Sequence, residues 1–466
     1  MADEFLGYHS EWNLGSPGGW DYQRMAQEIA RFSWQKIKEK SGINIELDFD
    51  HPILNPVPLF AQMLLRAHSK NFGKVKPFIV LVAEEETLEK VGENIRFVEY
   101  LNTLPNVKAS LVSPTSLEQK DGQVFVNGDR VTVVFLDFNN NVIVKLRKKH
   151  NLDALFTAIK QGIVINPRGM EPVGAKGVFE AVTSEFKDLI SETTLKRTPW
   201  TRQFYPRSTT GPNGKTIPDL IKWAKDNWSN IILKPGHGYS GHGIIIGHKT
   251  SDIKSSIKNA LDAGDYIIQP LIPMELWAED FPWIDRENKN VFIKRFQTDF
   301  RCFVTDKGPI GCVTRFGGIP TNVGSGGGVQ STAILRSDIA VKEAIERINN
   351  AILKLGFDFL ADLQNQIDEK SIKIGNVYLL GPIPSTLRPR IITTKHIEQI
   401  KHYSQNLWHD AVKLENLWLE GKLSKYVQIT QEEEEIAHLA PWKGSVALLA
   451  SDGLFNFTDT ECEKIQ

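Results

Sequence analysis

Five consecutive apolar residues, Phe78 to Val82, are followed by a helical pattern near Glu85 to Leu101. A buried strand of a parallel sheet has this length and this unbroken apolar character. Parallel strands cannot be joined by a tight turn, so a strand that leads into a helix predicts a βα crossover. The chain is therefore expected to contain an α/β unit with a parallel sheet.

Other segments carry further patterns. Asn127-Gly128 lies between two apolar runs, Val124 to Val126 and Val131 to Phe135, and predicts a β-hairpin with a type I′ turn. Helices are predicted over Asp21 to Lys40, Asn151 to Gln161, Lys176 to Ile190 and Val341 to Leu355, and again after Thr394. Strand pairs are predicted for Phe300 to Val304 with Gly311 to Arg315, and for Phe357 to Leu363 with Ile372 to Leu380.

Composition excludes several classes of protein. The 466 residues allow two to four structural units at roughly 100–200 residues per domain. Hydrophobic residues make up 41% of the chain and charged residues 24%, so a core can form and disorder of the whole chain is excluded. With 55 Lys and Arg against 56 Asp and Glu, the net charge of -1 provides no general basic field for nucleic acid.

The sequence also bears on compartment. No apolar run reaches about 18 residues, and the first residues lack the basic flank and apolar core of a signal peptide. The three cysteines, Cys302, Cys312 and Cys462, form neither a disulfide framework nor a zinc pattern. We therefore expect a cytoplasmic protein whose partners include neither a membrane nor a nucleic acid.

A glycine-rich segment joins two apolar strand patterns, Ile231 to Lys234 and Ile244 to Ile246. Glycine has no Cβ, so backbone N–H groups can approach an anion closely, and Lys234 adds a positive charge. The segment predicts a phosphate-binding loop, with a plain glycine hairpin as the alternative. It is neither a Walker A motif nor a Rossmann fingerprint, because it leads into a strand rather than a helix.

Three further groups are candidates for the site. Arg301 and Arg315 lie on a predicted hairpin and suit a phosphoryl group or a carboxylate; the alternative is a surface ion pair between Arg301 and Asp299. The run from Thr321 to Gly328 predicts an anion or substrate loop, or else a mobile linker. Glu11 and Asn13 would share one face of a strand and present oxygens suited to Mg²⁺, unless they mark only an exposed strand end.

The order of these segments resembles the ATP-grasp superfamily, and most of all its circularly permuted members, which include glutathionylspermidine synthetase-like and eukaryotic glutathione synthetase-like enzymes. The resemblance covers about Asp121 to Ser331 and the first twenty residues. Asn166-Pro167 with Lys176 resembles the segment that bears the first nucleotide lysine. Ile268 to Leu271 resembles the hinge that meets adenine through its backbone. Asp121 to Gly128 with Val131 to Phe138 resembles the hairpin before the central domain.

The permutation concerns the metal ligands. In ordinary ATP-grasp enzymes a Glu-x-Asn pair closes the domain near its C-terminal end, whereas Tyr378 to Pro384 has no Glu or Asn in the expected places. Glu11-Trp12-Asn13 resembles the missing pair, supplied from the other end of the chain as in the permuted members. Asp362, on the neighbouring predicted strand, is the expected third ligand.

The resemblance implies an ATP- and Mg²⁺-dependent carboxylate–amine ligase that forms an amide bond through an acyl phosphate. Its substrates would be a small-molecule acid and an amine, and family habit makes a homodimer a possible assembly. The residues implied for catalysis are Arg301, Arg315 and Asn322; for the nucleotide, Lys176, Lys234, Gly238, Tyr239, Ser240, Gly241, Gln269, Leu271, Ile272 and Glu275; for the substrate, Ser325, Gly326, Gly327 and Gly328; and for the metal, Glu11, Asn13 and Asp362.

Two other functions remain open at this point. One is a phosphotransferase of the same fold, and the other is a nucleotide-binding scaffold without turnover. The implied architecture is α/β (α+β), a circularly permuted ATP-grasp fold. It comprises a metal-binding strand in residues 1–20, a pre-ATP-grasp α/β domain in 21–170, an ATP-grasp domain in 171–390 with a lid at about 190–275, and a C-terminal helical cap in 391–466.

Overall fold

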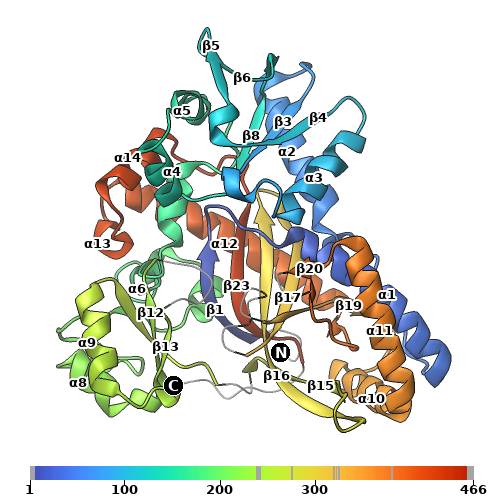
Figure 1. Cartoon of the computed structure of the whole chain (residues 1–466). Coiled ribbons are helices and arrows are strands. Elements are labelled where there is room, and N and C mark those ends of the chain that lie inside the picture. Colours follow the sequence, from blue (N-terminus) through green and yellow to red (C-terminus); the bar gives the residue numbers. More distant parts are fainter. Residues whose placement is uncertain are drawn as a thin grey trace.

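The structure is a computed structural model that describes residues 6–237, 243–273, 276–318, 321, 323, 326–378 and 381–458. It is a mixed α/β protein in which three sheets surround the candidate site. In Figure 1 the small parallel sheet lies at the top, the central antiparallel sheet in the middle and a four-stranded sheet at the lower left. No helix in these described ranges is both long enough and apolar enough to cross a membrane.

The central sheet joins the two ends of the chain. Its strand order is β1-β23-β16-β17-β18, with β15 paired to β16, and all of its pairs are antiparallel. The last strand in sequence therefore lies between the first strand and the middle of the chain. The strands are β1 (Leu6–Asn13), β15 (Ala278–Asp285), β16 (Asn290–Thr305), β17 (Gly308–Gly317), β18 (Gly328–Gln330) and β23 (Leu449–Asn456).

The two faces of the central sheet differ in chemistry because successive side chains of a strand point to opposite faces. Phe300, Cys302 and Val304 of β16 pack into a core cluster with the long helix α12 (Thr394–Leu419). Phe303 packs instead with residues of α1 (Trp20–Ser41) and α2 (Pro56–Phe72). Asp299 and Arg301 point to the same face as Phe303, because they lie four and two positions before it in β16. They border a cavity on that face.

The predicted α/β unit is confirmed. Strands β4 (Lys108–Val112), β3 (Phe78–Val82) and β8 (Val133–Leu136) form a parallel sheet in that order, with a parallel bridge from Val134 to Val164. All five residues of β3 are buried. The turn predicted at Asn127-Gly128 is confirmed, because β6 (Gln123–Val126) pairs with β7 (Asp129–Arg130) and both turn residues have positive φ. The predicted second arm, Val131 to Phe135, lies mostly in β8 of the parallel sheet instead.

The predicted strands around the glycine-rich segment form an antiparallel sheet in the order β13-β12-β14-β9. Its strands are β9 (Arg202–Gln203), β12 (Ile231–Pro235), β13 (Ile245–Ile246) and β14 (Tyr266–Pro270), and helices α8 (Leu220–Asp226) and α9 (Ile253–Ala263) pack with it. Two smaller sheets have three strands: β2 (Leu47–Asp48), β19 (Thr332–Leu335) and β22 (Arg390–Ile392) form one, and β5 (Glu118–Lys120), β6 and β7 form the other. Two more have two strands: β10 (Thr209–Thr210) with β11 (Thr216–Ile217), and β20 (Val377–Tyr378) with β21 (Gly381–Pro382).

The remaining helices connect and cover these sheets (Figure 1). The helices predicted over 21–40, 151–161 and 341–355 are present. These three are α1, α5 (Asp153–Lys160) and α10 (Val341–Lys354). The helices not yet described are α3 (Gly92–Thr103), α4 (Asn140–Arg147), α6 (Val178–Val182), α7 (Glu192–Arg197), α11 (Gly356–Ile374), α13 (Ser424–Val427) and α14 (Gln431–Leu439).

Three predictions were wrong. The segment predicted as a strand at Phe357 to Leu363 is the first half of helix α11, whose buried residues Leu360, Leu363 and Ile367 have the spacing of one helical face. The helix predicted over 176–190 is not continuous, because this range contains only the short helix α6 and a 3-10 turn at Lys187–Leu189. The C-terminal segment is not only a helical cap, because its β23 is an interior strand of the central sheet.

Candidate functional site

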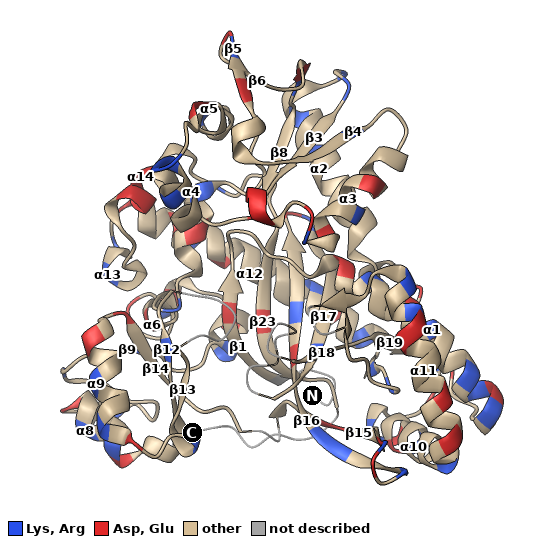
Figure 2. Ribbon diagram, in the orientation of Figure 1, with Lys and Arg blue, Asp and Glu red and all other residues tan. Residues whose placement is uncertain are grey.

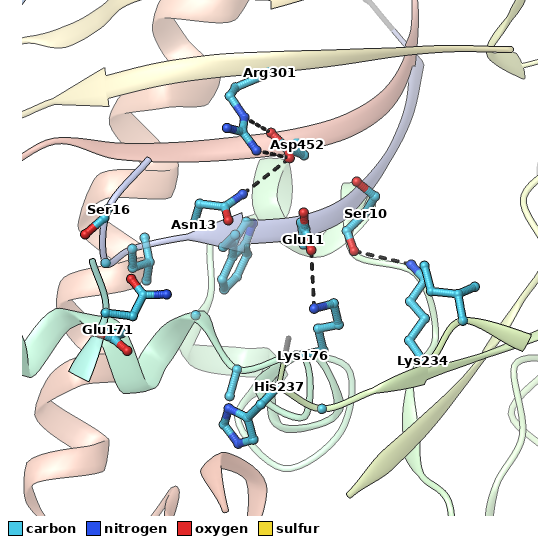
Figure 3. A pocket seen from close by; sticks show the side chains of 18 of the residues that line it. Ser10, Glu11, Asn13, Ser16, Glu171, Lys176, Lys234, His237, Arg301 and Asp452 are labelled. Atoms are coloured by element: carbon cyan, nitrogen blue, oxygen red, sulfur yellow. Dashed lines mark hydrogen bonds and ion pairs between the residues drawn. The ribbon is translucent and has the colours of Figure 1, made fainter. Parts of the chain in front are cut away.

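A cavity of about 590 Å³ lies where the three sheets meet. Strands β1, β12, β14, β16, β17 and β23 contribute to its wall, together with the segments that follow β3 and β8. Figure 3 shows charged side chains from both ends of the chain pointing into this space, and Figure 2 shows acidic and basic residues close together on the central strands. Nine of the predicted site residues line it: Glu11, Asn13, Lys176, Lys234, Gln269, Leu271, Ile272, Arg301 and Arg315.

Asp452 of β23 holds the charged groups of the central sheet together. It is the cross-strand neighbour of Glu11. Its two carboxylate oxygens each accept a 2.6 Å hydrogen bond from Arg301, through Nε and Nη2. Asn13 Nδ2 donates to the same carboxylate at 3.3 Å. Burial would raise the pKa of Asp452, but Arg301 and Arg315 lower it overall to about 2, so this residue is ionised at neutral pH.

Arg315 is held by a different carboxylate. Its Nε and Nη2 donate to the two oxygens of Asp299 at 2.9 and 2.7 Å, and Nη2 also lies 3.2 Å from Asp452. The alternative of an ion pair between Arg301 and Asp299 is wrong, because Asp299 pairs with Arg315. Nη1 of Arg315 has no partner within the described ranges, so the guanidinium retains donors for a ligand.

The two lysines approach Glu11 and β1 from the opposite side of the cavity (Figure 3). Lys176 Nζ lies 3.3 Å from Glu11 Oε2, and Lys234 Nζ donates to the Ser10 carbonyl oxygen at 3.3 Å. Lys234 is only 9% exposed. Burial, reinforced by the charge of Lys176 and opposed by Glu11, lowers the pKa of Lys234 to about 8. The side chain of Lys234 has thus lost most of its contact with water.

Local geometry explains one glycine of the phosphate-loop motif. Gly236 N donates to the Asp265 carbonyl at 2.7 Å, and its own carbonyl accepts from Lys176 N at 3.0 Å. A Cβ at Gly236 would lie 2.5 Å from the Asp265 carbonyl oxygen, and this distance is too short for any residue with a side chain. Gly236 thus holds the segment bearing Lys176 against the end of β12.

The predicted hinge, Ile268 to Leu271, overlaps the last residues of β14. Gln269 Nε2 donates to Thr201 Oγ1 at 2.8 Å, and Leu271 N donates to the Asn230 carbonyl at 2.7 Å. Since the Leu271 N–H is already bonded within the protein, it is not available to a base. The Ile272 N–H has no partner among the residues described here, and Ile272 lines the cavity.

The other predicted residues divide into two groups. Asp362 lies on α11 and not on the expected strand, accepts a hydrogen bond from Gln366 and is not part of the cavity wall. Gly326, Gly327 and Gly328 do not line the cavity either; Gly328 begins β18, where a Cβ would meet the Phe316 ring and the Pro384 carbonyl at 2.4 Å. Seven predicted residues lie outside the described ranges: Gly238, Tyr239, Ser240, Gly241, Glu275, Asn322 and Ser325.

Sequence reasoning missed Asp452 and Asp299 as members of the charge cluster. Asp452 had a detectable signal, since it is the single acidic residue in the apolar run from Val446 to Phe457. A carboxylate in such a run is buried only when it is paired. Asp299 was recognised in the segment Asp299-Phe300-Arg301, which resembles a phosphate or substrate element, and as an alternative partner for Arg301, but not as the partner of Arg315.

The oxygen atoms of Glu11, Asp452 and Asn13 can be compared with the ligands that a divalent cation prefers. Glu11 and Asp452 place two carboxylates side by side on adjacent strands, and the Oδ1 of Asn13 is not used in its bond to Asp452. Hard oxygen donors of this kind suit Mg²⁺. These three residues offer oxygen donors of that type, although no group of three or more His, Cys, Asp or Glu among the described residues is placed to hold a metal ion. Asp362 lies outside the cavity wall.

Comparisons with known proteins give only partial likenesses. No family model and no curated protein matches the chain. Solved structures that overlap with it include a RimK-domain ATP-grasp protein from Sphaerobacter thermophilus (13% identity, covering 50% of this chain and 71% of that chain, TM-score 0.28). Others are D-alanyl-alanine synthetase A from Vibrio cholerae (12%, 48% and 67%, 0.26) and D-alanine–D-alanine ligase from Bacillus anthracis (11%, 75% and 99%, 0.28). At these scores the likeness assigns neither family nor activity.

Proposed function

We propose that this protein is an ATP-dependent carboxylate–amine ligase of a circularly permuted ATP-grasp type. The observation that carries the proposal is the convergence of Lys176, Lys234, Arg301 and Arg315 on one cavity, beside the oxygen donors of β1 and β23. Four basic groups around a partly buried space provide the electrostatic environment that a transferring phosphoryl group requires.

The nucleotide would occupy the part of the cavity between β12, β14 and β1. Lys234 and Lys176 would bind its phosphates, because both lie in the wall and Lys234 has lost most of its hydration. Ile232, Ile244 and Leu271 line the cavity and would supply apolar contacts for the base. The Ile272 N–H, which has no partner among the described residues, would donate to a ring nitrogen of adenine, because the Leu271 N–H is bonded to the Asn230 carbonyl.

Glu11, Asn13 and Asp452 would hold Mg²⁺, which when bound neutralises charge on the nucleotide phosphates. Asp452 replaces Asp362 in this assignment because it shares the cavity wall with Glu11. Arg301 and Arg315 keep Asp452 ionised, so it does not need to lose a proton before it binds a cation.

The reaction would proceed in two transfers. A carboxylate oxygen of the acid attacks the γ-phosphorus of ATP, the bond to the β,γ-bridging oxygen breaks, and ADP leaves. A neutral amine then attacks the carbonyl carbon of the acyl phosphate, loses a proton and displaces orthophosphate, which yields the amide. Lys234 and Arg315 Nη1, which has no partner among the described residues, would stabilise the negative charge that moves through both steps.

Calorimetric titration of ATP with Mg²⁺ tests the nucleotide assignment. Wild type should bind ATP, and Lys234→Met should weaken binding roughly 10- to 100-fold because a charge-assisted hydrogen bond is lost. Lys222→Met, an exposed lysine of α8, is the matched control and should bind like wild type. Equal affinity in all three proteins would remove the proposed nucleotide site.

Phosphate release distinguishes the ligase from its alternatives. A screen of acids with and without amines should give orthophosphate only when both substrates are present. A stable phosphorylated product would identify a phosphotransferase instead. Binding of ATP without turnover in any pair would favour a scaffold.

A further inference from the structure

Glu93, the second residue of helix α3, binds the turn that precedes helix α1. Glu93 is buried, with 7% of the residue exposed. Its Oε1 and Oε2 accept hydrogen bonds from the Gly19 N–H at 2.8 and 2.9 Å. Oε2 also accepts from the Asp21 N–H at 2.9 Å. One carboxyl group of α3 therefore holds the start of α1, although the two segments lie more than seventy positions apart in the sequence.

The other end of the same peptide group holds Arg301. The Gly18 carbonyl oxygen accepts a hydrogen bond of 2.8 Å from Arg301 Nη1. The C=O of Gly18 and the N–H of Gly19 belong to one planar trans peptide group and point in opposite directions. This peptide group cannot turn away from Glu93 without also moving the acceptor of Arg301. Glu93 and Arg301 thus bind opposite ends of a single rigid group.

Two glycines allow this close arrangement. Gly19 has a φ of 104°, in the left-handed region that favours glycine. A Cβ at Gly18 would lie 3.1 Å from Glu93 Oε1, which is tighter than ordinary van der Waals contact. The Gly18-Gly19 sequence therefore lets the carboxyl group of α3 approach the backbone of the turn.

Helix α3 is itself fixed against α1 by packing. The ring of Trp20, the first residue of α1, contacts the ring of Phe97 on α3 with their centroids 5.9 Å apart. Both rings are buried. Arg96 Nε of α3 donates to the Asp21 carboxylate at 2.5 Å. Because close-packed side chains have little freedom, the position of Glu93 relative to the turn is well defined.

Capping of α1 accounts for only part of these contacts. The α1 N-cap, Gly19, has no side chain that could accept from the first turn, and the bond from the Asp21 N–H to Glu93 replaces that cap. The bond from the Gly19 N–H holds the peptide group that binds Arg301. Burial raises the pKa of Glu93 to about 8, and the bonds from Gly19 and Asp21 oppose that rise. A carboxyl group keeps an acceptor oxygen in either protonation state, so the contact does not depend on its charge.

The contact matters because of the donors that Arg301 has left. A guanidinium group has five N–H donors. Within the described ranges, Arg301 uses three of them, two for Asp452 and one for the Gly18 carbonyl (Figure 3). Arg301 lines the cavity, and the direction of its two remaining donors follows from the three bonds already made. We propose that Glu93 is a positioning residue, which orients Arg301 toward the cavity through the Gly18–Gly19 peptide group.

Arginine side-chain NMR tests the proposal without any nucleotide. In protein with isotope-labelled arginine, the Arg301 signals are those that disappear in Arg301→Lys. Glu93→Met removes both acceptor oxygens at similar side-chain length, and it should shift and broaden the Arg301 Nη signals. Glu93→Gln keeps one acceptor oxygen and should cause a smaller shift, so it also provides a test if Glu93→Met does not fold.

Glu415→Met is the matched control for a buried acceptor. Glu415 is also buried and also accepts from two backbone N–H groups, those of Trp442 and Lys443, but it is not part of the cavity wall. Its replacement should leave the Arg301 signals unchanged. Unchanged Arg301 signals in Glu93→Met and Glu93→Gln, or an equal change in Glu415→Met, would overturn the positioning role.

A double-mutant cycle connects this role to the proposed ligase function, on which its use in catalysis rests. Glu93→Met should weaken binding of ATP with Mg²⁺ about fivefold, as expected for the disturbance of one hydrogen-bonding group. In an Arg301→Lys background the same change should have no further effect, because Glu93 acts through Arg301. Equal weakening in both backgrounds would contradict the proposal. If wild type does not bind ATP, the ligase proposal fails, whereas the NMR signals still decide whether Glu93 positions Arg301.

Discussion

Asn13, near the start of the chain, donates a hydrogen bond of 3.3 Å to Asp452, near its end, across 439 residues of sequence. The bond exists because β1 and β23 are antiparallel neighbours. It brings the two chain ends together beside Arg301, which comes from the middle of the sequence. The charge cluster of the candidate site is therefore complete only in the assembled central sheet.

Replacement of Glu11, the proposed metal ligand, should change the Mg²⁺ dependence of ATP binding. Glu11→Gln should raise the Mg²⁺ concentration needed for ATP binding about tenfold or more, because a neutral amide is a poorer ligand than a carboxylate. Asp362→Asn is the matched control, since Asp362 lies on α11 outside the cavity wall. Titration of Mg²⁺ at fixed ATP measures the effect. A shift in the Asp362 variant instead would restore the assignment made from the sequence.

ATP affinity should fall at alkaline pH. Burial and Lys176 lower the pKa of Lys234 to about 8, with Glu11 acting in the opposite direction. Below about pH 8 the lysine is already charged, whereas above it ATP must bind together with a proton. Affinity should then decrease by up to about tenfold per pH unit until the ordinary lysine range is reached. Calorimetry in buffers of different ionisation enthalpy would detect the proton uptake, and Lys234→Met should show none.

Loss of the Asp452 charge should destabilise the whole protein. Asp452→Asn leaves Arg301 without its buried counter-charge, at a cost of about 3–5 kcal/mol. Asp280→Asn removes an exposed carboxylate paired with Arg295 and should cost about 1 kcal/mol or less. Urea unfolding at neutral pH compares them. Similar losses in the two variants would show that the buried pair adds no special stability.

Acid should weaken the stabilisation that the ion pair between Asp452 and Arg301 provides. The folded-state pKa of Asp452 is about 2, below its ordinary value of 3.8, so its stabilising contribution is present above about pH 4. That contribution is lost as pH falls through the folded-state pKa near 2. The difference in unfolding free energy between wild type and Asp452→Asn should therefore narrow in acid. A constant difference down to about pH 2 would contradict the pairing.

Truncation tests whether the C-terminal segment is part of the core. A chain that ends at Leu448 lacks β23, so β1 and β16 lose the strand between them, and it should not reach the native far-UV circular dichroism or stay soluble. A chain that ends at Thr458 keeps β23 and should fold like wild type. Native-like folding of the shorter chain would mean that the segment is only a cap.

Local sequence patterns were sufficient for the elements whose own residues carry the signal. The apolar run at Phe78 to Val82 predicted a buried parallel strand, and Asn127-Gly128 predicted a hairpin, because each pattern reports the environment or dihedral angles of its own residues. The strand prediction for Phe357 to Leu363 was wrong because a short apolar run does not by itself distinguish a strand from a helix. The continuation of the buried spacing to Ile367 distinguishes them.

The sequence by itself determined the chemistry available to the site: a lysine before a glycine-rich loop, two arginines on one hairpin, and a Glu-x-Asn pair on the first strand. Only the tertiary structure decided that Asp452, rather than Asp362, joins Glu11 and Asn13. It also decided that Glu84 and Asp137, which follow strands of the parallel sheet, line the same cavity. The reason is physical, since strand pairing between distant segments is set by burial of the whole sheet, and no local periodicity encodes which strands become neighbours.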